Sequence, residues 1–154
     1  MIRASIFLGL VSLTCAAAAA TGPVVFNGTV DPTCTLTVTR NGTMTVNAAL
    51  QSLSSHNAGG QSGLVDLSTT GGVTLSVDAA VSSVTVPAAD TSATTWSPTY
   101  STSGTHSFVE GSGAHALAGA GASVVTVHLT GAKSGSDAFS AGAYQATVTI
   151  RCEP

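Results

Sequence analysis

Charged residues are what the sequence most lacks. Asp, Glu, Lys and Arg make up 7% of the 154 residues, against about 25% in an average soluble domain. With a net charge of -3, the chain has no basic surface to attract nucleic acid or anionic lipid, and neither is expected as a partner. Hydrophobic residues nevertheless reach 44%, whereas disordered chains are poor in them. The composition therefore predicts a folded protein.

Long apolar runs are lacking outside the N-terminus. There, MIRASIFLGLVSLTCAAAAATGP places Arg3 before an apolar stretch from Ile6 to Leu13, which small alanines follow. This order is typical of a secretory signal peptide, and the apolar stretch is too short to span a membrane. We predict a helical signal peptide at residues 1–20 and a single domain at residues 21–154, with no membrane span after cleavage. The mature chain is expected in the periplasm, on the cell surface or outside the cell.

Cysteine is scarce as well, with three in the chain. Cys15 falls within the expected signal peptide. As an alternative it would carry the lipid of a lipoprotein, although the preceding Ser-Leu-Thr fits that signal poorly. Its removal leaves Cys34 and Cys152, which have only one intramolecular pairing in an oxidising compartment. We therefore predict a Cys34–Cys152 disulfide in preference to a metal site made from two lone cysteines.

Apolar and polar residues alternate around both cysteines. Residues 34–39 place the first cysteine, Leu and Val on one face and Thr on the other. Residues 144–153 place Tyr, Ala, Val, Ile and the second cysteine on one face. Alternation with a period of two predicts half-buried strands, with both sulfur atoms facing the core. The disulfide then joins the first long strand to the last, and the two are expected to be neighbours.

Asn41-Gly42 predicts a turn after the first long strand, because this pair favours the backbone of hairpin turns. A two-residue turn would set the apolar face of one strand against the polar face of the next. A three-residue loop over residues 40–42, with Gly42 left-handed, pairs Val38 with Met44 instead. The register therefore favours a hairpin with the longer loop.

Short strands rich in Thr and Val, with turn residues between them, continue through the chain. This pattern predicts an all-β fold, an immunoglobulin-like two-sheet β-sandwich of about 7–9 strands. Outside the signal peptide, one helical turn at most is expected, at residues 47–53, and residues 110–122 are expected to form a loop with a short strand around Leu117. Further strands are expected at residues 63–69, 72–78, 81–86 and 123–130, with weaker candidates at 24–30, 95–100 and 105–109.

The sequence contains no recognisable catalytic constellation. No serine lies in G-x-S-x-G, no glycine-rich loop opens a phosphate-binding helix, and the carboxylates are dispersed along the chain. We expect a non-enzymatic protein without a cofactor. An enzyme of an unrecognised type is a third hypothesis, after a structural protein and a binding module.

Two binding sites remain as alternatives. An exposed Trp96 and Tyr100 would offer an aromatic platform to a glycan, although a core or rim position is expected for the tryptophan. The histidines lack ligand spacing such as H-x-H, and His128 is expected alone on a solvent-facing position. A metal site on loops would use His106 and His115. Either site would make the protein a periplasmic or extracellular binding module.

Both ends of the mature chain resemble known bacterial surface proteins. FNGTVDPTC, residues 26–34, resembles the opening segment of chaperone–usher pilins, and AGAYQATVTIRC, residues 141–152, resembles the last strand of pilins and of spore coat protein U domains. The resemblance implies an immunoglobulin-like sandwich at the cell surface, in families whose subunits assemble by donated β-strands. It implies a pilus- or coat-like structural role, with further copies or other envelope subunits as partners.

Two departures from pilins predict a self-complete domain. About a dozen residues separate the expected cleavage site from Cys34, too few for both a donated extension and a first strand of its own. The second departure is the disulfide, which reaches the terminal strand here but usually ties early strands in pilins. A chain closed from end to end is therefore expected to have little need of a borrowed strand.

Overall fold

The structure, a computed structural model, describes residues 20–79 and 81–154. The expected signal peptide at residues 1–20, with Cys15, lies outside the described residues except for Ala20. No helix forms in the described part of the chain, so the all-β prediction is confirmed there. More strands form than expected, because the strand predicted at residues 144–153 is divided in two and residues 52–54 form a strand that was not predicted. The twelve strands are β1 (Cys34–Arg40), β2 (Thr45–Val46), β3 (Ser52–Ser54), β4 (Gly63–Thr69), β5 (Val73–Val77), β6 (Ser83–Thr85), β7 (Thr95–Gly104), β8 (Phe108–Gly111), β9 (His115–Leu117), β10 (Gly121–Ala132), β11 (Gln145–Thr147) and β12 (Ile150–Glu153).

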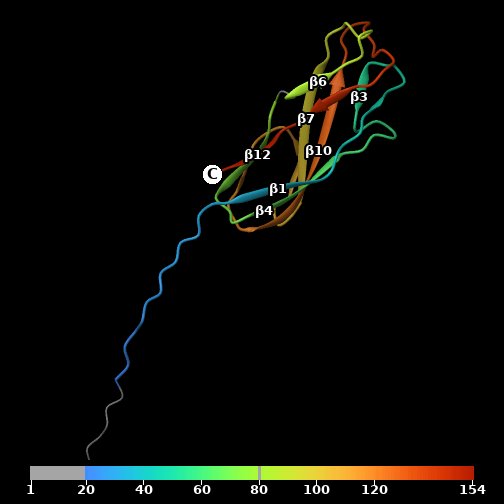
Figure 1. Cartoon of the computed structure of the whole chain (residues 1–154). Helices are drawn as coiled ribbons and strands as arrows, with labels where there is room; N and C mark the ends of the chain where they lie inside the picture. Colours follow the sequence, from blue (N-terminus) through green and yellow to red (C-terminus); the bar gives the residue numbers. More distant parts are fainter. Residues whose placement is uncertain (1–19, 80) are drawn as a thin grey trace, which may run out of the picture.

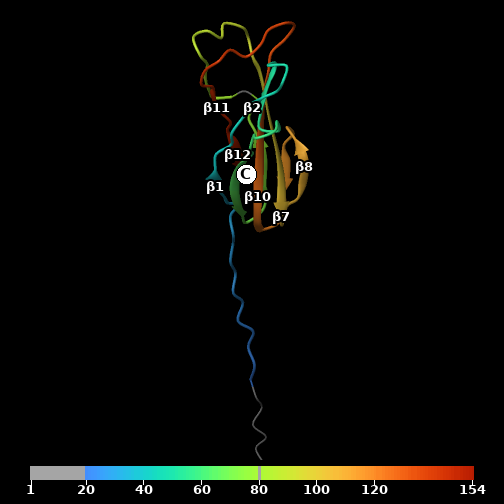
Figure 2. The same cartoon turned by 90° about the vertical axis from the view of Figure 1, so that its right-hand side faces the viewer.

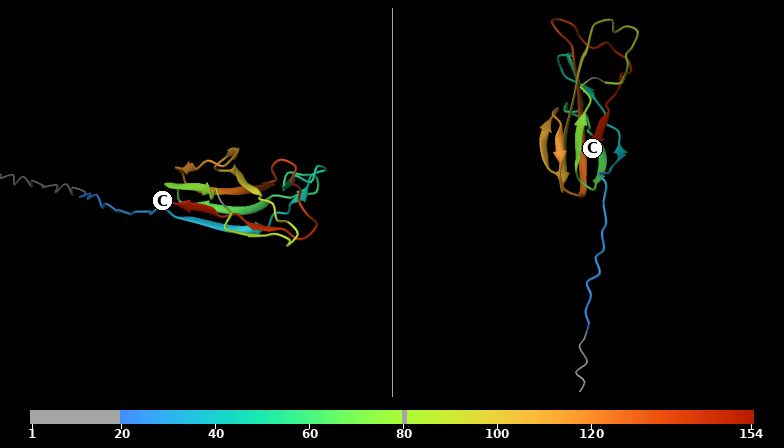
Figure 3. Two further views of the ribbon diagram at one scale, coloured as in Figure 1. Left: turned by 90° about the horizontal axis from the view of Figure 1, so that it is seen from above. Right: turned by 90° about the vertical axis from the view of Figure 1, so that its left-hand side faces the viewer.

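The strands form two layers (Figures 1 and 3). In the first layer β4 pairs with β1 on one side and with the long β10 on the other, and β10 pairs in turn with β7, which pairs with β8. β3 continues this layer along the far part of β10 and pairs with β2. In the second layer β5 lies between β9 and β12. The β6–β11 pair extends that layer, because the Asp78 and Ser82 amides donate to the Thr149 and Thr147 carbonyls.

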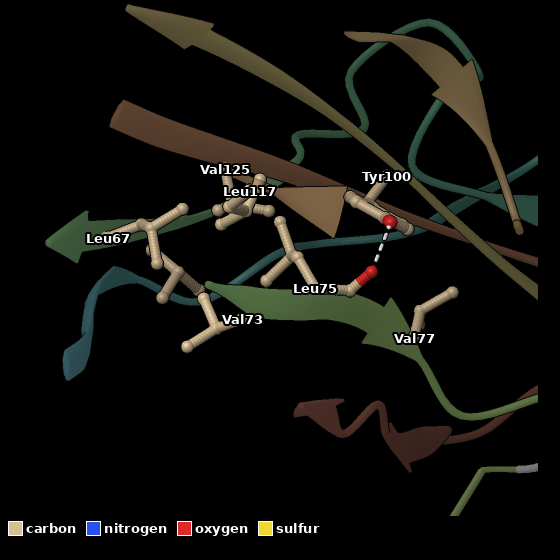
Figure 4. Close-up of a cluster of buried hydrophobic side chains, with 8 residues drawn as sticks. Leu67, Val73, Leu75, Val77, Tyr100, Leu117 and Val125 are labelled. Atoms are coloured by element: carbon tan, nitrogen blue, oxygen red, sulfur yellow. Dashed lines mark hydrogen bonds between the residues drawn. The ribbon is translucent and has the colours of Figure 1, made fainter. Parts of the chain in front are cut away.

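The core fills the space between the layers (Figure 4). The Tyr100 hydroxyl lies 2.9 Å from the Leu75 carbonyl oxygen and 2.8 Å from that of Gly113, so its single proton always has an acceptor. The bond to Leu75 joins β7 to β5 across the core. The most deeply buried side chains, each less than 2% exposed, come from both layers: Leu67, Tyr100 and Val125 from the first, Leu75 and Leu117 from the second.

The predicted hairpin after the first strand does not form. β1 pairs with β4, while β2 pairs with β3, and Gly42 does not adopt a left-handed backbone. Its backbone instead packs closely against the start of β4, where a β-carbon would lie only 3.1 Å from backbone atoms. The register between β1 and β4 explains why β1 pairs with β4 and not with the strand that follows Gly42. β4 sets Leu67 opposite Leu36 and Val65 opposite Val38, so apolar side chains pair across the ladder.

Most of the other predicted strands form close to the expected positions. β4, β5, β6, β7, β8 and β10 each overlap a predicted segment, and the loop at residues 110–122 contains the short β9 with Leu117 fully buried. The strand predicted at residues 144–153 is divided into β11 and β12. The weaker strand candidate at residues 24–30 does not form, because these residues pair with no strand. Residues 47–50 form a hydrogen-bonded turn and no helix, within the limit of one helical turn expected for residues 47–53.

The predicted Cys34–Cys152 disulfide is confirmed, and it joins the two layers. Its cysteines lie at the start of β1 and within β12, with Cα atoms 6.1 Å apart although 118 residues separate them along the chain. Figure 3 shows the first strand, in blue, and the last strand, in red, side by side. The bridge therefore holds the outer strands of both layers together at one end of the sandwich.

We expect replacement of both cysteines by serine to lower the free energy of unfolding by about 4–5 kcal/mol, because a loop of this length restricts the unfolded chain by that amount in the chain-entropy model. Urea unfolding of the oxidised protein, the reduced protein and the double variant measures the effect. The reduced protein and the double variant should unfold at the same, lower urea concentration. Equal stability of all three would contradict a structural role for the bridge.

A buried ion pair organises the loops at the other end of the sandwich, at the top of Figure 2. Lys133, directly after β10, places its Nζ 2.6 Å from Asp90 Oδ1, and both side chains are almost fully buried. The ammonium group also donates to the Ser92 carbonyl, and the Tyr144 hydroxyl donates to Asp90 Oδ2 at 2.6 Å. Both carboxylate oxygens thus accept hydrogen bonds, as a buried charge requires. The cluster joins the segments before β7, after β10 and before β11.

These contacts predict how the stability of the protein changes as the pH falls. The hydrogen bonds from Lys133 and Tyr144 hold the pKa of Asp90 below its usual value. Its contribution to stability is therefore complete above the pKa of the unfolded chain and is lost as the pH falls through the pKa in the folded protein. We expect Asp90→Asn to be less stable than the wild type at neutral pH, and the difference to shrink in acid. Unfolding free energies between about pH 6 and about pH 2 measure this.

The matched control for this measurement is Asp66→Asn, at an exposed position on β4. Its stability should follow that of the wild type across the whole range. A difference between Asp90→Asn and the wild type that stayed constant with pH would contradict the assigned role of the Asp90 carboxylate.

Candidate functional site

Two strand edges are free where the layers meet at one side of the sandwich. β1 pairs only with β4, while β11 and β12 pair only with β6 and β5, so within the described residues each has one edge without a partner strand. The disulfide draws these edges together at one end. Between them lies a groove of about 430 Å³. An unpaired edge beside an apolar groove is a place where a further strand can be added.

Apolar side chains line the groove from both layers, and several of them are incompletely covered. Val38 is 66% exposed, and Leu36, Val127, Val148 and Ile150 are only partly buried although they pack against the core. One more strand between the free edges would cover them. The apolar lining includes Leu36, Val38, Val65, Val127 and Leu129 from the first layer and Ala146, Val148 and Ile150 from the second.

The residues before β1 form an exposed arm. Residues 20–33, called the arm below, run away from the sandwich (Figures 1 and 2) and pair with no strand. The apolar side chains of the arm are almost wholly in solvent: Val24 is 76%, Phe26 91% and Val30 79% exposed. Burial of such a side chain stabilises a protein by about 1.5–3 kcal/mol. Binding of this arm to an apolar surface would therefore lower the free energy of the system.

The arm also has the sequence pattern of a half-buried strand. Val24, Phe26, Gly28 and Val30 would project from one face of an extended strand, and the positions between them are mostly polar. Gly28 has no neighbouring atoms within 4 Å of the place where a β-carbon would lie. Residues 24–30 therefore have the alternation of a half-buried strand, but no strand among residues 20–79 and 81–154 pairs with them.

Hydrogen bonds at the root of the arm fix its direction. The Thr33 amide donates to Thr70 Oγ1 at 2.7 Å, and Thr69 Oγ1 donates to the Thr33 carbonyl at 2.8 Å. Thr70 Oγ1 in turn donates to the Asp31 carbonyl at 2.9 Å. These contacts hold residues 31–33 against the turn between β4 and β5. The arm therefore leaves the sandwich at the disulfide end and points away from the groove of its own chain.

The aromatic platform considered for a glycan is not formed. Tyr100 is 1% exposed and belongs to the core, so it presents no face to a ligand. Trp96 lies near the start of β7. Its indole covers the backbone of Gly131 on β10, where a β-carbon would lie 2.6 Å from the ring. Trp96 therefore packs on the sheet and is partly buried, in keeping with the core or rim position expected for it.

The structure gathers a different set of histidines from the expected one. His115 stacks on an aromatic ring of β8, and the Nε2 atom of His106 is buried without a hydrogen-bond partner in the described structure. Within residues 20–79 and 81–154, the one group of three possible metal ligands comprises His56, Glu110 and His128. The three lie on different elements, so no local spacing joins them. The outward position of His128 was the only signal of this group in the sequence.

No protein-family model, characterised protein or solved structure matches the chain. Among residues 20–79 and 81–154, no helix is long and apolar enough to cross a membrane. What the chain does must therefore be inferred from the groove and the arm.

Because Trp96 covers a glycine and not a ligand, we expect Trp96→Ala to lower the free energy of unfolding by about 2 kcal/mol, less than the roughly 3–5 kcal/mol typical of a fully buried tryptophan. Urea unfolding measures the loss, and Trp96→Phe, which keeps a ring over the glycine, should lose less. Unchanged stability of Trp96→Ala together with lost glycan binding would contradict this assignment.

Proposed function

We propose that this chain is an exported, non-enzymatic structural protein of a bacterial envelope, pilus- or coat-like, whose copies join by strand donation. In this proposal the arm of one copy lies in the groove of the next. A single observation carries it. The same chain has an uncovered apolar groove between two free strand edges and an uncovered arm whose apolar residues alternate. The arm offers an apolar strand without a surface to cover it, and the groove offers an apolar surface and free edges without a strand.

The lengths of the two parts agree. Residues 22–30 of the arm, which precede its hydrogen-bonded root, span about 30 Å when extended at about 3.3 Å per residue. The free edge that runs through β11 and β12, residues 145–153, spans about 30 Å on the same basis, and the free edge of β1 spans about 23 Å. One arm is therefore long enough to follow the whole groove.

Strand addition would satisfy the backbone and the side chains together. The amides and carbonyls of a donated strand pair with a free edge, while alternate side chains enter the groove. Val24, Phe26 and Val30 would then leave water for the apolar walls. The arm carries one charged residue, Asp31 at its root, so the donated stretch would bring almost no charge out of water.

The donor in this proposal is a second copy and not the chain itself. To enter its own groove the arm would have to reverse at residues 31–33, which three hydrogen bonds hold against the turn after β4. The sequence had predicted a self-complete domain because too few residues precede Cys34 for a strand and an extension. In the structure the first strand begins at Cys34 itself, so residues 20–30, which precede the hydrogen-bonded root, are free to be donated.

The resemblance to pilins supports the same proposal. Its two motifs fall on the arm, residues 26–34, and on one wall of the groove, residues 141–152. These are the two parts that strand donation would bring into contact. The immunoglobulin-like form of the sandwich and the export of the chain belong to this proposal as well, and a disulfide is in keeping with an oxidising compartment.

A pair of arm variants tests strand donation. We expect the wild-type mature chain to form oligomers that survive denaturing detergent without heating and separate on heating. Phe26→Asp should abolish them, because it would bury a charge in an apolar groove. Asn27→Asp adds the same charge on the opposite face of the arm and should retain them. Gel electrophoresis of heated and unheated samples gives the result.

The controls for this test use the monomer. Both variants should melt at the temperature of the wild-type monomer, because neither side chain contacts the sandwich. A synthetic peptide of residues 21–32 should raise the melting temperature of Phe26→Asp, and the same peptide with Asp in place of Phe26 should not. A wild-type chain that stays monomeric at high concentration would exclude strand donation. Oligomers retained by both variants would locate assembly elsewhere.

A further inference from the structure

Three side chains from distant parts of the chain meet on the outer face of the first layer. His128 lies on β10, Glu110 on β8, and His56 in the loop after β3. Their possible ligand atoms, one nitrogen from each imidazole and one carboxylate oxygen, all lie within 4.8 Å of one another. Alternation along β10 directs His128 outward, because its neighbours Val127 and Leu129 face the core side.

Direct contacts hold this cluster together. His56 Nε2 lies 3.0 Å from Glu110 Oε1. The His56 ring also stacks on the ring of His128, with centroids 3.8 Å apart and planes inclined by 12°. Thr99 Oγ1 on β7 donates to the same Glu110 oxygen. The second oxygen, Oε2, accepts no hydrogen bond from the described residues and is available to a ligand.

Ser55 orients His128 from the protein side. Its Oγ lies 2.9 Å from His128 Nδ1 and accepts the Leu129 amide at 3.2 Å, and the serine is buried. With Nδ1 protonated and donating to Ser55, the Nε2 atom of His128 presents its lone pair. A hydrogen bond on the far ring nitrogen is a regular feature of histidines that bind metal ions, because it fixes the tautomer and the ring orientation.

Contacts within the cluster shift the pKa of two of its side chains. Burial, and after it the neighbouring His56, lower the pKa of His128, so its neutral form is favoured. Burial by itself would raise the pKa of Glu110, but the hydrogen bonds from Thr99 and His56 outweigh it and lower that pKa.

We propose that His56, Glu110 and His128 form a binding site for one divalent transition-metal ion, with zinc as the ion to test first. Two imidazoles and one carboxylate are a frequent zinc ligand set, with a fourth position left to water or another ligand. The imidazole nitrogens distinguish this site from magnesium and calcium sites, in which the ligands are oxygen atoms.

Binding requires a small local rearrangement. In a tetrahedral site with bonds of about 2.0–2.1 Å the ligand atoms lie about 3.3 Å apart. The three ligand atoms, which now lie within 4.8 Å of one another, must therefore move closer together. His56 must also turn out of the stack, because the lone pairs of parallel rings do not converge on one point, and it then binds through whichever ring nitrogen of the neutral imidazole carries no proton. Its side chain is 47% exposed and lies in a loop, so this movement displaces no core residue.

Titration of the mature chain, free of any histidine tag, with Zn²⁺ against a chromophoric chelator tests the site. We expect one Zn²⁺ per chain. His56→Ala, His128→Ala and Glu110→Gln should each weaken binding by at least about ten-fold. His106→Gln, the matched control at a histidine outside the cluster, should bind as the wild type does.

Nuclear magnetic resonance of the histidine side chains gives a second result that does not depend on any variant. Zn²⁺ should shift the ring nitrogen signals of His56 and His128 and leave those of His106 and His115 in place. Zn²⁺ binding that the three variants leave unchanged, one ion per two chains, or the absence of saturable binding would overturn the proposal.

The proposed metal site is complete within one chain, so it is tested separately from strand donation. Phe26→Asp, which is expected to remain monomeric, should bind Zn²⁺ as tightly as the wild type. If zinc binding were lost in that variant, the site would require assembly, and the proposal of a site within one chain would be wrong.

Discussion

The disulfide between Cys34 and Cys152 is the constraint on which the arrangement of this protein depends. It fastens the outer strand of one layer to the outer strand of the other at a single end, so two free edges begin together there. The same bridge places the root of the arm, because β1 begins at the bridged cysteine and the residues before it are held against the turn at Thr70. The bridge therefore sets the end at which the groove and the arm begin, and the hydrogen bonds at Thr70 set the direction of the arm.

The opposite end of the sandwich is held by an interaction of another kind. Lys133, the single lysine of the sequence, is buried against Asp90 together with the Tyr144 hydroxyl. A buried pair gains little net stability, because both charges lose their hydration, but it accepts few alternative arrangements. With the covalent bond at one end and this cluster at the other, the edges between them are supported at both ends. In the proposed assembly, this support at both ends preorganises the groove for the donated strand and lowers the entropy lost on binding.

The features that could be predicted from the sequence are those that depend on local pattern or on a count. Alternation placed both cysteines on inner faces, and two cysteines left one pairing. The partner of β1 could not be deduced, because Val38 finds an apolar neighbour equally in Met44 after a tight turn and in Val65 on β4, and long-range packing decides between them. The same limit applies to His128. Its neighbours come from a loop and a strand that only the folded sheet brings beside it, so it was expected to stand alone.

The low charge of the chain has a consequence at the free strand edges. Charged side chains usually protect an edge strand from pairing with another chain. On these edges they stand only near the ends: Arg40 at the end of β1, and Arg151 and Glu153 in β12, where Arg151 pairs with Asp78 at 2.6 Å. The stretches between, residues 35–39 and 145–150, contain no charged residue. The outer strand β8, on the far side of the first layer, carries a glutamate instead. In the proposed assembly, these edges, which lack charges along their middle, accept one strand of matching length without burying a charge.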